Sequence, residues 1–170
     1  MSPMVKSISR HLLQLAALFV VAAYGCRSGQ GFFLSVEMPV SQFVQTQNAD
    51  PSAGRIYDFP TLQAYNGSGQ LIYFSHDAEA NAALLRSLPE SLEHLSVIPN
   101  GPELQVSLRH LPVVNDQARR TLSRSGRPVV VAYTLEDCHA CSVQEEALKP
   151  TAGQMIAKRG VDVLSVRILR

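Results

Sequence analysis

The chain of 170 residues contains no tryptophan, and aromatic residues make up only 6% of it. Its longest apolar stretch, residues 12–24, has 13 residues, whereas a membrane-spanning helix needs about 20. Neither sign of charge is in excess, because 15 Lys and Arg residues face 14 Asp and Glu residues. A nucleic-acid-binding surface built on excess positive charge is therefore not expected. The remaining composition, with 46% hydrophobic residues, is typical of one globular domain.

The first 25 residues have the pattern of an export signal. Lys6 and Arg10 form a basic head, the short apolar stretch follows, and small residues precede Cys26. The segment AAYGC, which ends at Cys26, resembles the lipobox of bacterial lipoproteins. This resemblance implies cleavage before Cys26, a lipid on its sulfur and, because Arg27 follows, a place in the outer membrane facing the periplasm. The alternatives are ordinary cleavage at Gly25 and an uncleaved anchor.

The cysteine count agrees with a lipid on Cys26. Three cysteines are an odd number for an exported chain, in which an unpaired thiol is unusual. Assigning Cys26 to the lipid leaves Cys138 and Cys141 as one pair. The oxidising compartment then holds no unpaired thiol from this chain.

Apolar periodicity and turn residues predict an α/β fold. Strands are expected at residues 31–38, 61–65, 70–75, 104–109, 128–134 and 161–169, and helices at residues 39–47, 77–88, 116–125 and 138–159, the last broken near Pro150. The predicted organisation is a signal at residues 1–25, an N-terminal segment at residues 26–54, and a domain at residues 55–170 that comprises a hairpin and helix (55–88), a linker (89–103) and a cysteine-bearing half (104–170).

Cys138 and Cys141 directly follow the buried strand predicted at residues 128–134 and open the next predicted helix. The thiolate is the reactive form of cysteine, and a free cysteine with a pKa of about 8.5 is mostly protonated at neutral pH. The N-terminus of a helix stabilises a thiolate, and a spacing of three places both sulfurs on one face of its first turn. Redox chemistry is favoured over a structural disulfide, which usually closes a longer loop, and over a metal site, because zinc needs four ligands.

The strand, the bend at residues 134–137, the Cys-x-x-Cys and the helix that follows resemble the active-site segment of the thioredoxin family. This resemblance implies that Cys138 is the nucleophile, that Cys141 is the resolving thiol, and that no cofactor is needed. The chain departs from the family in having His139 between the cysteines and no proline there. A protonated His139 favours the thiolate, whereas the two acidic residues before Cys138 oppose it. The buried acid that assists the resolving thiol in the family is replaced by Ala132.

The second half of the thioredoxin fold, which opens with a cis-proline and continues as a hairpin and a helix, does not follow residues 104–169. Residues 59–88 contain that order of elements upstream, beginning with the sequence FPTL. We therefore expect a circularly permuted thioredoxin-like mixed sheet flanked by helices, with Pro60 against Cys138. The resemblance implies that Pro60 is cis, and the alternative is an ordinary loop proline with a trans bond. Two alternatives stay open, namely a truncated fold with an added hairpin and a second, partial thioredoxin-like domain at residues 31–88. The segment FLSVEMP in that region resembles a strand end of thioredoxin-like pilus-assembly proteins of conjugation systems.

The expected function is that of a thiol–disulfide oxidoreductase anchored by lipid on Cys26 to the periplasmic side of the cell envelope. The expected partners are protein thiols or disulfides and a redox partner protein, but not nucleic acid. Cys138 and Cys141 are the expected catalytic residues, and His139 and Pro60 tune the site. The alternative is a non-catalytic thioredoxin-like binding or assembly module of an envelope or conjugation apparatus.

Overall fold

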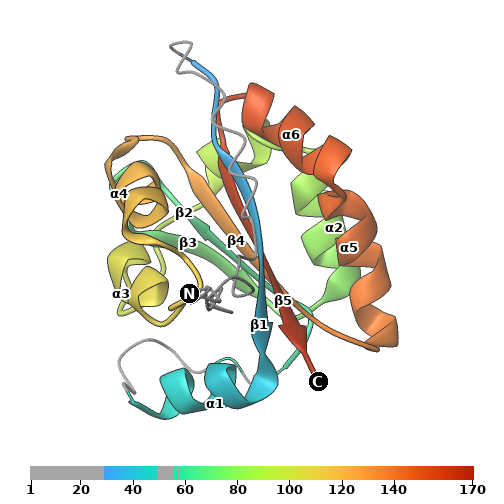
Figure 1. Ribbon diagram of the computed structural model, residues 1–170. Helices are drawn as coiled ribbons and strands as arrows, with labels where there is room; N and C mark the ends of the chain where they lie inside the picture. Colours follow the sequence, from blue (N-terminus) through green and yellow to red (C-terminus); the bar gives the residue numbers. More distant parts are fainter. Residues whose placement is uncertain (1–28, 50–55, 57) are drawn as a thin grey trace, which may run out of the picture.

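A computed structural model describes residues 29–49, 56 and 58–170 (Figure 1). The predicted signal at residues 1–25 and the predicted lipid attachment at Cys26 lie outside these residues. The described elements are β1 (Phe33–Pro39), α1 (Val40–Ala49), β2 (Thr61–Tyr65), β3 (Leu71–Ser75), α2 (Ala78–Arg86), η2 (Glu90–His94), α3 (Leu104–Arg109), α4 (Asp116–Arg124), β4 (Val129–Leu135), η3 (His139–Cys141), α5 (Ser142–Leu148), α6 (Pro150–Lys158) and β5 (Asp162–Leu169), in which η denotes a 3-10 helix.

A five-stranded mixed sheet forms the middle layer, in the order β1-β5-β4-β2-β3. Strands β1, β5 and β4 run parallel, and β2 is antiparallel to both β4 and β3. Helices α3 and α4 lie on one face of the sheet, α2, α5 and α6 lie on the other, and α1 crosses one end (Figure 1). The predicted α/β class and mixed sheet with flanking helices are thus present.

The strand directions bring several chain segments to one edge of the sheet. The three parallel strands end at this edge, which is called the carboxyl edge below. Because β2 is antiparallel to β4, it begins at the carboxyl edge, and β3 ends there. The residues that follow β4 and those that precede β2 therefore lie together, although they are far apart in the sequence.

The core has one apolar cluster on each face of the sheet. One cluster joins α1, α3 and α4 to the sheet and includes Phe43, Leu104, Leu108, Leu122, Tyr65, Val131, Tyr133, Leu164 and Ile168. The other joins α2, α5 and α6 to the opposite face and includes Leu62, Ala64, Leu84, Leu85, Leu88, Val130, Ala132, Leu148, Ile156 and Val163. The first six residues of β4 are buried because this central strand is covered on both faces, as its unbroken apolar run predicts.

The helix boundaries follow local signals in the sequence. The side chains of Asp77 and Asn115 cap α2 and α4 by accepting hydrogen bonds from the backbone N–H groups of Ala80 and Ala118. Pro150 begins α6, since proline tolerates the first turn of a helix but not its interior. The helix predicted at residues 138–159 is accordingly divided into η3, α5 and α6, with the predicted break at Pro150.

The strand predicted at residues 104–109 is wrong, because this segment forms helix α3. Its apolar residues alternate, but Leu104 and Leu108 also have the four-residue spacing that aligns side chains on one helical face, and both are buried. Both edges of β4 are already occupied, by β5 and β2, so the central strand offers this segment no partner. The first parallel strand is instead β1, which pairs with β5 through seven register positions.

The described part of the predicted N-terminal segment and the predicted linker both belong to the same folded structure. β1 and α1, which the sequence analysis assigns to an N-terminal segment, contribute an edge strand of the sheet and part of the core. The predicted linker at residues 89–103 contains η2 and begins after a cis Leu88–Pro89 peptide bond. The backbone N–H of Ile98 donates to the carbonyl of Leu71, so the linker returns along the edge strand β3.

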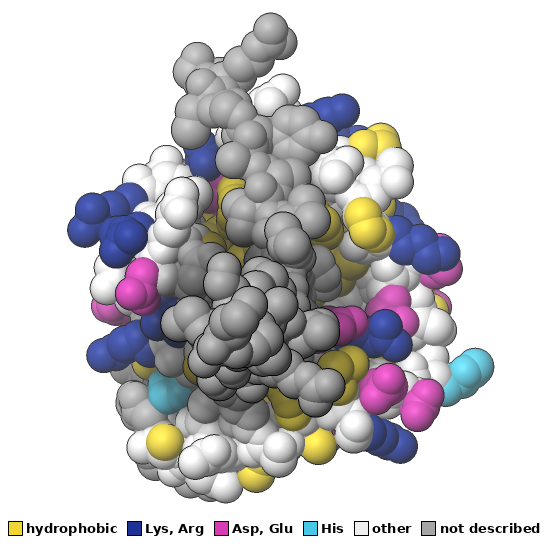
Figure 2. Space-filling model, viewed as in Figure 1, with side chains coloured by type: hydrophobic (Ala, Val, Ile, Leu, Met, Phe, Trp, Pro, Cys, Tyr) yellow, Lys and Arg dark blue, Asp and Glu magenta, His cyan; other side chains and the backbone are white. Residues whose placement is uncertain are grey.

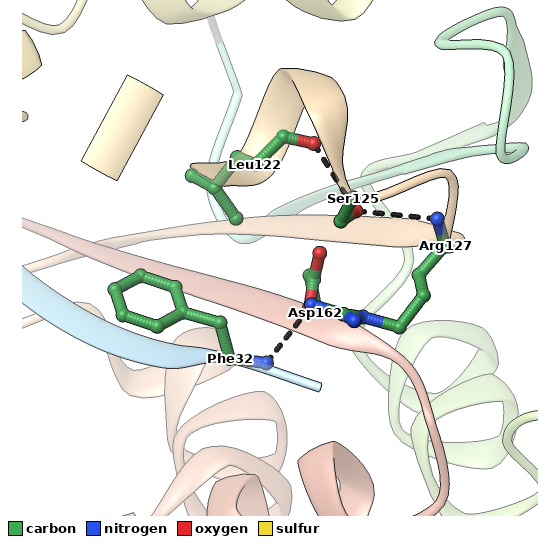
Figure 3. Close-up of polar contacts among 5 residues, drawn as sticks. All are labelled: Phe32, Leu122, Ser125, Arg127 and Asp162. Atoms are coloured by element: carbon green, nitrogen blue, oxygen red, sulfur yellow. Dashed lines mark hydrogen bonds and ion pairs between the residues drawn. The ribbon is translucent and has the colours of Figure 1, made fainter. Parts of the chain in front are cut away.

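A buried ion pair closes the end of the sheet opposite the carboxyl edge (Figure 3). The fully buried side chain of Asp162 begins β5, and its Oδ1 accepts hydrogen bonds from the Phe32 backbone N–H at 2.7 Å and from Arg127 Nε at 3.0 Å. Ser125 Oγ accepts from the Arg127 backbone N–H, which fixes the turn between α4 and β4. The Asp162 carboxylate at the start of β5 therefore connects the segments that precede β1 and β4.

Candidate functional site

Cys138 and Cys141 form a disulfide at the carboxyl edge, directly after the central strand β4. Their Cα atoms are 5.2 Å apart. Cys138 is partly exposed, whereas Cys141 is fully buried. The two residues thus differ in exposure to solvent, which reaches Cys138 in part and Cys141 not at all.

The chain reaches Cys138 through a tight bend. Asp137 has a positive φ of 58°, a conformation that Asp tolerates better than most residues, and the Cys138 backbone N–H donates to the Leu135 carbonyl. Cys138 is then the N-cap residue of η3, with its Sγ 3.1 Å from the backbone N–H of Cys141 that donates to it. Since η3 has three residues and α5 has seven, this N–H contact, rather than a long helix dipole, provides the local positive potential at the sulfur.

The segment that precedes β2 lies against the disulfide. The carbonyl oxygen of Phe59 is 3.8 Å from Cys138 Sγ, the Phe59–Pro60 peptide bond is cis, and Pro60 is buried. Thr61 begins β2 and is the register partner of Tyr133 in β4. The two sides of the site are therefore fixed by adjacent strands.

A buried polar network lies behind the disulfide, and the sequence analysis missed it. Gln144 Nε2 donates to the carbonyls of Thr61 and Tyr133, and Gln144 Oε1 accepts from Asn81 Nδ2 at 2.7 Å. His76 Nδ1 contacts Thr61 Oγ1 at 2.8 Å. The only sequence signal was the placement of Gln144 three residues after Cys141, on the face of the helix that turns towards the sheet.

Acidic residues and a histidine lie next to Cys138 in the chain. His139 and Asp137 are exposed, and the carboxylate of Glu136 accepts a hydrogen bond from the backbone N–H of Arg170 at 3.0 Å. Behind them, burial raises the pKa of the Tyr133 phenol well above its usual value. Ala132 is fully buried within the apolar cluster that contains Leu62.

Apolar side chains on α1 border the site. The rings of Phe43 and Phe59 are 5.7 Å apart between centroids, which places α1 beside the segment that contacts Cys138. Val40 and Val44 on the same helix are 37% and 50% exposed, and isolated hydrophobic side chains are visible over α1 at the lower edge of the molecule (Figure 2). Apolar side chains of α1 are therefore exposed close to the segment that contacts Cys138.

The structure brings Cys138, Cys141, His139 and Pro60 to one place, whereas Cys26 lies outside the described residues. Within the described ranges, no three His, Cys, Asp or Glu side chains are grouped as metal ligands. No helix among those residues has both the length and the apolar character needed to span a bilayer. The chain matches no protein-family model, no curated protein and no solved structure in the comparisons made.

Proposed function

We propose that this protein is a thiol–disulfide oxidoreductase of thioredoxin-like fold that acts on protein thiols or disulfides. The observation that carries the proposal is the unequal burial of its two cysteines, since Cys138 is partly exposed and Cys141 is fully buried. An exposed sulfur can form a mixed disulfide with a substrate, and the buried sulfur three residues later can displace that substrate. A disulfide kept only for stability gains little from closing so short a loop.

The arrangement of strands supports a thioredoxin-like sheet whose second half is inserted after its first strand, an order that is not a circular permutation. The hairpin β2–β3 and helix α2 follow Pro60, as the second half of that fold follows its cis-proline, yet they precede the cysteines in the chain. β2 pairs with β4, so the hairpin takes the place beside the cysteine-bearing strand. The first strand of the fold is β1, and the chain connects it to the hairpin before it reaches β4.

The proposed reaction needs no cofactor. In the oxidising direction, a substrate thiolate attacks Cys138 Sγ, the bond between Cys138 and Cys141 breaks, and Cys141 leaves as a thiolate that takes up a proton. A second substrate thiolate then attacks the substrate sulfur of the mixed disulfide and releases the thiolate of Cys138. Two substrate thiols are oxidised to one disulfide, and the protein gains the two electrons. A redox partner protein reoxidises the pair, and the same steps in reverse reduce a substrate disulfide.

The proposed location is the periplasmic side of the cell envelope, with the chain anchored in the outer membrane through lipid on Cys26. The sequence pattern around Cys26 supports this part of the proposal. Such a compartment is oxidising, which agrees with a disulfide between the two remaining cysteines.

The variant Cys141→Ala tests the proposal because it removes the thiol that resolves the mixed disulfide. We expect this variant, expressed in its native envelope, to accumulate covalent complexes with other proteins that dithiothreitol releases. Non-reducing electrophoresis followed by mass spectrometry measures these complexes. The matched control is Cys138→Ala, which should trap nothing because Cys141 is fully buried and Cys26 carries the proposed lipid.

Equal trapping by both variants, or none by either, would contradict an oxidoreductase. The second candidate, a non-catalytic binding or assembly module, would then be favoured. One observation supports that candidate. The segment FLSVEMP, which resembles a strand end of conjugation pilus-assembly proteins, forms strand β1 and ends it at Pro39.

A further inference from the structure

Gln144 is a neutral, fully buried side chain one helical turn after Cys141. Both hydrogens of its amide are used, since Nε2 donates to the carbonyl of Thr61 at 3.3 Å and to that of Tyr133 at 3.2 Å. Its oxygen accepts from Asn81 Nδ2 at 2.7 Å. One side chain on α5 therefore binds β2, β4 and α2 together.

The strands that Gln144 joins are the two that flank the disulfide. Thr61 directly follows Pro60, and Tyr133 lies in the strand that leads to Cys138. A shift of α5 relative to either strand would leave a buried amide or carbonyl without a partner, which costs more than the hydrogen bond itself contributes. The three bonds thus oppose movement of the cysteine-bearing turn against the Phe59–Pro60 segment.

The titratable side chains near Gln144 reach it only through other residues. Tyr73 donates its hydroxyl to Asn81 Oδ1 at 3.1 Å, and His76 Nδ1 contacts the hydroxyl of Thr61. Tyr133 contributes its backbone carbonyl, and Cys141 is held in the disulfide. Among the described residues, the hydrogen-bond partners of Gln144 itself are all uncharged.

We propose that Gln144 is a positioning residue, which fixes Cys138 and Cys141 at a set distance from the Phe59–Pro60 segment so that a polypeptide thiol can reach Cys138 between them. This inference rests on the proposed oxidoreductase function. Gln144 contacts neither sulfur, so it acts through geometry and not through the acidity of a thiol. A small thiol needs access to the sulfur alone, whereas a polypeptide must also fit beside Phe59 and Pro60.

The first test compares two reductants of the oxidised protein, which are dithiothreitol and a decapeptide with one cysteine. In Gln144→Met, a side chain of similar length loses all three hydrogen bonds. We expect its rate constant with the peptide to fall about tenfold, while its rate constant with dithiothreitol stays within about twofold of wild type. The measurement is acid quenching followed by mass spectrometry of the reduced and mixed-disulfide forms.

The matched control is Tyr65→Phe, which also removes buried hydrogen bonds from β2. Tyr65 OH bonds to Gln63 and Ser107 at the far end of that strand, about 13 Å from Thr61 at the rise of a β-strand. This control should leave both rate constants within about twofold of wild type. Equal slowing of both reductants by Gln144→Met, or slowing of the peptide by the control, would overturn the positioning role.

A second variant keeps the inference testable if Gln144→Met does not fold. Gln144→Glu has nearly the same shape, but an ionised carboxylate cannot donate to two carbonyls, whereas a protonated one can donate to one. The ratio of its peptide rate to that of wild type should therefore rise as the pH falls, and the ratio cancels ionisation of the peptide thiol. A ratio that does not change with pH contradicts the proposal.

The outcomes separate the two proposals. If wild type reacts with the peptide and the Gln144 variants have the same rate constants at every pH, the positioning role is wrong and the proposed function is unaffected. A wild-type protein that is inert toward the peptide, with no complexes trapped by Cys141→Ala, overturns both.

Discussion

The ion pair between Arg127 and Asp162 allows a sharp prediction about stability, because its two members differ in burial. The Asp162 side chain is fully buried and the Arg127 side chain is 30% exposed. Removing the arginine leaves a buried carboxylate without its charge partner, whereas neutralising the aspartate leaves a guanidinium that water still reaches. The variants Arg127→Met and Asp162→Asn should therefore have unequal effects (Figure 3).

The expected sizes follow from the contacts. Arg127→Met should lower the free energy of unfolding by about 3–5 kcal/mol, the usual cost of leaving a buried charge unpaired. Asp162→Asn keeps an oxygen that accepts from the Phe32 backbone N–H and from Arg127, so its cost should be about 1–3 kcal/mol. In the double variant the carboxylate is absent, and the loss of Arg127 should then cost little. The two substitutions should thus be less harmful together than the sum of their separate effects.

Urea denaturation followed by far-ultraviolet circular dichroism measures these free energies in a chain without tryptophan. The dependence of the unfolding free energy on urea concentration should not change, because the surface exposed on unfolding is nearly the same in each variant. Additive effects in the double variant, or a loss below about 1 kcal/mol for Arg127→Met, would refute the reasoning.

Two further predictions concern the core. Burial raises the pKa values of the Tyr65 and Tyr133 phenols above their usual value of 10.0, so the folded chain keeps protons that the unfolded chain releases. Their contribution is complete below about pH 10 and is lost at higher pH, so Tyr65 and Tyr133 should ionise only as circular dichroism reports unfolding. Ionisation of these two phenols in the folded chain would contradict this. Gly153→Ala should destabilise the protein by about 1–3 kcal/mol in thermal or urea unfolding, because its new methyl group enters the ring of Phe33. Adding Phe33→Leu should recover part of that loss, and a stabilised single variant would disprove the overlap.

Much of the secondary structure is predictable because its signals are local. The hairpin of β2 and β3 follows from the Asn66–Gly67 turn, and Gly67 has a further role because a Cβ there would meet the backbone of Gly126. Asp77 caps α2 by accepting a hydrogen bond from the backbone N–H of Ala80, which is only three residues later in the sequence. The expectation that Pro60 lies near Cys138 came from the resemblance of two separate segments to one family, and in the structure the carbonyl of the neighbouring Phe59 is 3.8 Å from Cys138 Sγ.

The failures have a different cause. A six-residue segment such as α3 satisfies both helical and strand periodicity, and the choice depended on β4 having its two edges filled by strands from elsewhere. The network around Gln144 joins residues up to 83 positions apart, so no sequence window contains it. Its polar side chains are ordinary on a helix surface, and only the packed structure shows that they are buried.

The pairing of β1 with β5 has a consequence for how the protein is made. β1 is an edge strand whose one partner in the sheet is β5, and their register joins Phe33 to Val163 across most of the chain. The ribosome therefore synthesises β1 long before β5, the strand with which β1 pairs. The central strand β4 is likewise synthesised after the β2–β3 hairpin, whose strand β2 pairs with it. The sheet can be completed only when synthesis has passed residue 169. A chaperone that binds the growing chain, or a narrow pore through which it passes, therefore encounters a chain whose sheet is still incomplete.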